Sequence, residues 1–85
     1  MEKVSLVLIT YNEEENIEIC LNSLVNQDYN NEDYEIIVVD ASIDNTRKIV
    51  RNFSRVKLVE AEKKGYGFQR NLGVKNSAFS LIAFI

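Results

Sequence analysis

Short apolar segments alternate with amphipathic segments along the whole chain, and this alternation limits the folds that the chain can adopt. The apolar segments, which have the length of strands, cover residues 4–9, 34–39, 56–60 and 80–85. Between them, apolar side chains recur at helical spacing over residues 13–26, 44–53 and 67–77. Strands that alternate with helices are typical of a parallel sheet with crossover helices, so we expect an α/β fold.

Local signals predict where the helices begin. Asn12 precedes the first helix and Glu15 stands three residues later, which is the spacing of a capping box. Ser42 or Asp44 is placed to cap the second helix. All three glycines lie between residues 65 and 73, so we expect the unusual backbone of the chain to be there.

Composition excludes several classes of function. At 85 residues the chain is at most one small domain. Its net charge of -3 argues against a nucleic-acid or anionic-membrane surface. With no His and a single Cys, neither a zinc site nor a Ser-His-Asp or Cys-His nucleophile is expected. The N-terminus leads directly into a strand, so we expect no signal peptide and a cytoplasmic location, including the cytoplasmic face of a membrane.

Polar residues follow two of the predicted strands directly. Thr10, Tyr11, Asn12 and Glu13 follow the first strand, and Asp40 follows the second. In open parallel sheets, ligands bind outside the carboxyl ends of the strands. Asp40 and Glu13 could accept hydrogen bonds from a base and a ribose, and Tyr11 offers a face for stacking.

A plainer interpretation is that Asn12 caps a helix, that residues 13–15 serve its dipole and that Asp40 only ends a strand. We accept the plain interpretation for Glu14 and Glu15. We favour a functional one for Asp40, because it is an isolated charge after the apolar run Ile-Ile-Val-Val.

A phosphate would need positive charge, and this is expected beyond the third strand. The carboxylates of residues 13–15 would repel an anion from the first helix, and the glycines do not match a dinucleotide fingerprint. Lys63, Lys64 and Arg70 lie around the glycines instead. Arg70 is the preferred phosphate ligand because its planar fork suits phosphate, whereas at least one of the lysines is expected to be only solvated.

Four segments together resemble the opening segments of family 2 glycosyltransferases. They read VSLVLITYNEEENI, YEIIVVDASIDNT, KKGYGFQRNLG and SLIAFI, in the order of that family. The resemblance implies a GT-A fold, which is a Rossmann-like three-layer α/β/α arrangement with strand order 3-2-1-4. It also implies that Thr10, Tyr11, Asn12, Glu13 and Asp40 hold the nucleoside of a nucleotide-sugar donor and that Arg70 lies near the diphosphate. The loop after Asp40 is about one residue shorter than usual in the family, with Ala41 where an acid or amide is frequent.

The resemblance also implies an activity. The full protein would be an inverting enzyme that moves a sugar from a UDP- or GDP-linked donor to an acceptor hydroxyl. A divalent metal, Mg²⁺ or Mn²⁺, would neutralise the leaving diphosphate, and a downstream carboxylate would activate the acceptor. The metal motif and the base of the family follow the fourth strand, so we expect neither a catalytic residue nor a metal ligand in this chain.

The chain stops inside an apolar strand, so we expect residues 1–85 to be the N-terminal, nucleotide-binding piece of a larger domain. Alone it should be inactive and should self-associate through the uncovered edge of its fourth strand. Two alternatives stay open. A pyrophosphorylase-like nucleotidyltransferase would carry a Gly-rich loop after the first strand, which is absent here. A non-enzymatic receiver-like module would have an acidic cluster there, which residues 13–15 imitate.

Overall fold

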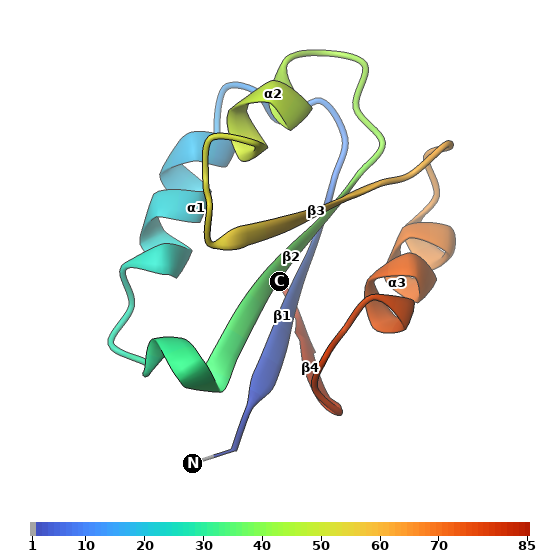
Figure 1. Cartoon of the computed structure of the whole chain (residues 1–85). Helices are drawn as coiled ribbons and strands as arrows, with labels where there is room; N and C mark the ends of the chain where they lie inside the picture. The colour runs from blue at the N-terminus through green and yellow to red at the C-terminus, as the bar shows by residue number, and fades with distance from the viewer. Residues whose placement is uncertain (1) are drawn as a thin grey trace.

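The structure, a computed structural model that describes residues 2–85, contains one parallel sheet. Its strands are β1 (Val4–Thr10), β2 (Tyr34–Asp40), β3 (Val56–Glu60) and β4 (Leu81–Phe84). The strand order is β3-β2-β1-β4 with every pair parallel (Figure 1). This confirms the expected α/β fold and its 3-2-1-4 order.

Helices cover both faces of the sheet. The helical elements are α1 (Ile17–Val25), the single turn η1 (Asn31–Asp33), α2 (Thr46–Val50) and α3 (Tyr66–Lys75). Figure 1 shows α1 and α2 on one face and α3 on the other. No helix in the described part of the chain is long and apolar enough to cross a membrane.

The central strand β2 is buried on both faces, which explains its continuous apolar sequence. Ile36 and Val38 pack with Leu21 of α1 on one face. Ile37 and Val39 belong to the cluster on the other face, under α3. Even-numbered side chains of β2 therefore point to α1 and α2, and odd-numbered ones point to α3.

The first helix begins later than the sequence predicts. Residues 14–16 form a turn, and the backbone N–H groups of Asn16 and Ile17 both donate to the carbonyl of Glu13. Asn12 adopts a left-handed φ of 53°, and its side chain accepts from the backbone N–H of Ile43 at 3.0 Å. The predicted capping box is therefore wrong, because the Asn12 side chain bonds to the loop after β2 and not to the helix.

The other two helices are also shorter than predicted. α2 covers five residues of the expected 44–53, and α3 ends two residues before the expected limit of 77. The proposed cap Asp44 does bond to the start of α2, because its Oδ1 accepts from the backbone N–H of Thr46 at 2.9 Å. The positions of all three helices are confirmed, and only their ends differ.

The glycine segment has ordinary backbone but one very close contact. None of the glycines of the described chain has a positive φ, so of the two unusual features that glycine allows at residues 65–73 only the close approach is found. A Cβ added at Gly73 would lie 2.5 Å from Cγ1 of Val7 and 3.3 Å from Cγ2 of Val39. Gly73 is therefore the position at which α3 approaches the sheet too closely for any side chain.

Strand β4 pairs along only the first part of β1. Leu81 to Phe84 align with Val4 to Val7, so the last three residues of β1 extend past β4. Leu81, Phe84 and Ile85 are exposed. In the described part of the chain, no strand pairs with the outer edge of β4.

The contact at Gly73 predicts a stability effect. Gly73→Ala should lower the free energy of unfolding by about 1–3 kcal/mol, because the new methyl group would force the buried Val7 side chain to move. Gly67→Ala is the matched control, since an added Cβ there meets nothing within 4 Å. It should leave stability unchanged or raise it by up to about 1 kcal/mol. Urea titration of both variants measures the difference, and equal effects would contradict the packing argument.

Candidate nucleotide site at the carboxyl end of the sheet

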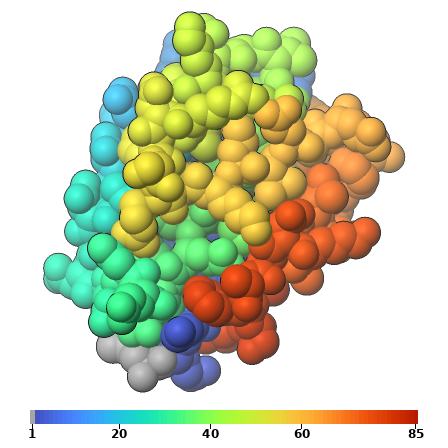
Figure 2. All heavy atoms as spheres, in the orientation of Figure 1, coloured from blue at the N-terminus to red at the C-terminus, as the bar shows by residue number. Residues whose placement is uncertain are grey.

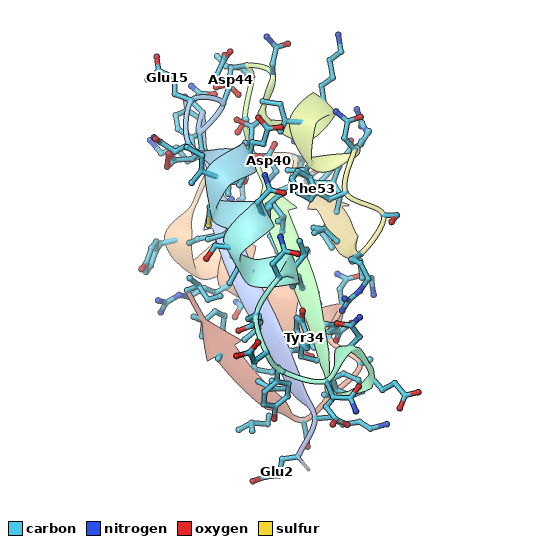
Figure 3. All side chains as sticks on the ribbon, turned by 90° about the vertical axis from the view of Figure 1, so that its left-hand side faces the viewer. Glu2, Glu15, Tyr34, Asp40, Asp44 and Phe53 are labelled. Carbon is cyan, nitrogen blue, oxygen red and sulfur yellow. The ribbon has the colours of Figure 1, made fainter. Side chains whose placement is uncertain are left out.

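The last residues of the two central strands face each other at the carboxyl end of the sheet. Thr10 and Asp40 are partners in the register of β1 and β2. The Thr10 hydroxyl donates to Oδ1 of Asp40 at 2.5 Å. In Figure 3, Asp40 lies toward the same end of the molecule as Asp44, with Tyr34 near the opposite end.

The Asp40 carboxylate is fully buried and has a complete set of donors. Besides Thr10, the Ser42 hydroxyl donates to Oδ1 at 2.6 Å. Oδ2 accepts from the Ser42 backbone N–H at 3.0 Å and from Nε of Arg47 at 2.9 Å. A buried carboxylate is costly unless it is paired and hydrogen-bonded, and this one is both. Its acceptor positions are thus occupied by the chain itself.

Arg47, which the sequence interpretation missed, connects three segments. Its guanidinium donates to the carboxylate and the backbone carbonyl of Asp40, to the carbonyl of Ala61 at 3.0 Å and to Glu60 at 3.2 Å. It therefore ties the end of β2 to the end of β3. One signal could have found it: an isolated carboxylate after a buried strand needs a cation, and Arg47 is in the first turn of the next helix.

The loops after β1 and β2 are joined by a ladder of hydrogen bonds. The backbone N–H of Asn12 donates to the Ser42 hydroxyl at 2.7 Å, and Ile43 donates to Asn12 as described above. The backbone N–H of Glu13 donates to the hydroxyl of the buried Thr46 at 2.9 Å. These bonds continue the pairing of the strands into the loops. The two loops, which form the rim at the carboxyl end of the sheet, are therefore held in place by hydrogen bonds.

Asp44 adds a pH-dependent contact to this ladder. Burial alone would raise the pKa of its carboxyl, but hydrogen bonds from Thr46 and Glu14 hold the pKa below its ordinary value. A carboxyl with a lowered pKa stabilises the fold above its unfolded-state pKa, and this contribution is lost as the pH falls through the folded-state pKa. The contact between the loops therefore weakens only in acid.

A cavity of about 290 Å³ opens beside this rim, between the end of β1 and the start of α3. Its lining residues are Ile9, Thr10, Tyr11, Glu13, Lys64, Gly65, Tyr66 and Gln69. In Figure 2 the segment that carries Lys64 and Tyr66 is drawn in orange on the flank of the molecule. The cavity thus combines two aromatic side chains, one carboxylate and one ammonium group.

Gln69 holds the floor of this cavity, and the sequence interpretation did not identify it. Its Nε2 donates to the carbonyls of Thr10 at 3.1 Å and Val39 at 2.9 Å, and its Oε1 accepts from the backbone N–H of Gly65 at 3.1 Å. It is buried although polar. Its place between Phe68 and Leu72, on the apolar face of α3, was the available signal.

Arg70 lies next to the cavity without lining it. Its guanidinium stacks 4.3 Å from the ring centre of Tyr66 and 4.7 Å from that of Phe84 in β4. Nη2 donates to the Tyr66 hydroxyl at 3.1 Å, whereas the buried Nε has no partner within the described chain. The structure therefore brings Thr10, Tyr11 and Glu13 to one cavity. Asn12 belongs to the hydrogen bonds between the loops, and Asp40 is buried beneath them. Arg70 is separated from the cavity by the side chain of Tyr66.

No group of three or more His, Cys, Asp or Glu side chains that could hold a metal ion occurs in residues 2–85.

The family model for glycosyl transferase family 2 matches residues 5–85. The chain belongs to glycosyl transferase family 2. Among curated relatives, it is 40% identical to Glycosyltransferase AglE of Haloferax volcanii over 96% of this chain and 29% of AglE. It is 34% identical to the poly(ribitol-phosphate) β-N-acetylglucosaminyltransferase TarS of Staphylococcus aureus, of which it covers 16%. The chain thus spans less than a third of the length of these family 2 relatives.

Two solved structures superpose closely on the chain. The S. aureus TarS 1-349 complex with UDP-GlcNAc has a TM-score of 0.90 and 34% identity, over 98% of this chain and 26% of TarS 1-349. The mannosyltransferase PcManGT of Pyrobaculum calidifontis, in complex with GDP-Man and Mn²⁺, has a TM-score of 0.84 and 31% identity, over 89% of this chain and 24% of its own. The sheet described above therefore matches the N-terminal part of the GT-A fold, as the sequence predicted.

Arg47 supports the rim of this family 2 chain through a buried ion pair, which predicts a large effect. Arg47→Ala should lower the free energy of unfolding by about 3 kcal/mol, because it leaves the Asp40 carboxylate buried without its cation. Arg51→Ala is the matched control, since Arg51 pairs only with exposed Glu60 and should cost at most about 1 kcal/mol. Thermal and urea unfolding measure both, and similar losses would show that the Asp40 pair is not special.

Proposed function

We propose that this chain forms the donor-binding half of an enzyme that moves a sugar from a nucleotide diphosphate sugar to an acceptor hydroxyl. The observation that carries the proposal is the cavity between β1 and α3, which gathers Tyr11, Glu13 and Lys64 at the carboxyl end of the sheet. A stacking face, an acceptor and a cation are the groups that a nucleoside diphosphate requires. The structural neighbours in complex with UDP-GlcNAc and GDP-Man support the same donor class.

The six predicted residues take different parts in this proposal. Tyr11 stacks on the base, and Glu13 accepts from the base or the ribose. Thr10 and Asn12 shape the rim through their bonds to Asp40 and Ile43. The direct contact of Asp40 with the base stays a prediction, and it requires one of the four present donors to give way.

The diphosphate and the chemistry extend beyond the cavity. Arg70 is expected near the diphosphate, and its unpartnered Nε is a donor that a phosphate oxygen could use. A divalent metal such as Mn²⁺ or Mg²⁺, when bound by residues outside this chain, would neutralise the leaving diphosphate. Within the proposal the 85-residue chain is inactive alone, and the cytoplasmic location also stays a prediction. The family match favours this function over a nucleotidyltransferase or a receiver-like module.

Tyr11 gives the sharpest test of nucleotide binding. In a full-length protein that contains this chain, Tyr11→Ala should weaken UDP or GDP binding by about 10- to 100-fold, because the base loses its stacking partner. Ile43→Ala is the control, since Ile43 is a highly exposed rim residue outside the cavity lining. Isothermal titration calorimetry measures both variants.

Two results would contradict the proposal. Absence of UDP and GDP binding by the wild-type protein would remove the nucleotide site altogether. An unchanged affinity in the Tyr11 variant would place the base away from this cavity.

The uncovered edge of β4 predicts self-association of the isolated chain. Its apolar residues Leu81, Phe84 and Ile85 are exposed, and its outer N–H and C=O groups have no strand partner in the described chain. An edge of this kind is a template for another copy. Sedimentation equilibrium at micromolar concentration should therefore show dimers or larger species, whereas a folded monomer would refute the edge argument.

A further inference from the structure

We propose that Lys64 makes the nucleotide cavity selective for nucleoside diphosphates over bare nucleosides. This inference rests on the proposed function and goes beyond it. Lys64 covers the aromatic face on which a base would stack, and phosphate oxygens offer its ammonium group a better partner when a base takes that face.

The ammonium group of Lys64 lies over the ring of Tyr11. The Lys64 Nζ lies 4.2 Å from the ring centre of Tyr11, which is well within the range of a cation–π interaction. Both side chains line the same cavity. Tyr11 is 39% exposed, so a base could reach it once the ammonium group has moved.

The energetic consequence differs between the two ligands. A nucleoside that stacks on Tyr11 must displace the ammonium group of Lys64. Its base and ribose are neutral, so they offer no negative charge to pair with the displaced ammonium group. A nucleoside diphosphate displaces the same group but brings phosphate oxygens within reach of a flexible four-carbon stem. Charge-assisted bonds to phosphate are stronger than an exposed cation–π contact, so the exchange favours the diphosphate.

Neighbouring groups make Lys64 the residue that performs this exchange. Lys63 stacks instead on Phe68 at 4.8 Å and is not among the lining residues of the cavity. The charged side chain that lines the cavity with Lys64 is the Glu13 carboxylate, which repels phosphate. A nucleoside diphosphate whose base lies in this cavity therefore needs the Lys64 charge to offset Glu13.

A charge-removal experiment tests the inference in the full-length protein. Calorimetric titrations with uridine, UDP, guanosine and GDP are compared for the wild type, Lys64→Met, Lys64→Arg and Lys63→Met. Lys64→Met should bind the matching nucleoside about 2- to 5-fold more tightly and its diphosphate about 10-fold more weakly. The preference for diphosphate over nucleoside should therefore fall by about 20- to 50-fold. Lys64→Arg and Lys63→Met should keep it.

The outcomes separate this inference from the proposed function. If the wild type binds UDP or GDP but Lys64→Met keeps the wild-type preference, the inference is wrong and the donor site stands. Equal losses for nucleoside and diphosphate would also overturn it, because they indicate a structural role for Lys64. If the wild type binds no nucleoside diphosphate, the proposed function fails and the inference fails with it.

Discussion

The structure depends on one buried carboxylate at the point where three strands and two loops meet. Asp40 cannot be buried without donors, and its four donors come from β1, from the loop after β2 and from α2. Satisfying this one group therefore fixes the end of β1 against the end of β2. Through Arg47 it also fixes the end of β3. The rim beside which the cavity between β1 and α3 opens follows from this requirement.

Neighbouring residues at the end of β1 take different places at the rim of the sheet. Thr10 and Asp40 point to the face of α1 and α2, where their polar groups form hydrogen bonds within the chain. Tyr11, one residue further on, belongs to the cavity with Lys64 on the α3 side. Thr10 also lines this cavity, but its hydroxyl is already bonded to Asp40, whereas the Tyr11 side chain is partly exposed.

The order of strands and helices could be predicted from the sequence, because the spacing of apolar side chains differs between a buried strand and an amphipathic helix. The bounds of β3 were predicted to the residue, and β1 and β2 each extend one residue further than expected. Local cap signals failed at Asn12 because a partner 31 positions away, Ile43, competes for its side chain. Arg47 and Gln69 were missed although each carried a signal. The isolated Asp40 carboxylate required a cation, and Gln69 stands on the apolar face of α3 between Phe68 and Leu72.

The hydrogen bonds between the two rim loops have a consequence for local opening of the structure. These bonds join residues about 30 positions apart, so opening either loop breaks bonds to the other. We therefore expect the two loops to open together with the strands that they follow, in the manner of a cooperative folding unit. Amide hydrogens in the rim should consequently exchange together with those of the central strands, unlike amides of ordinary surface loops.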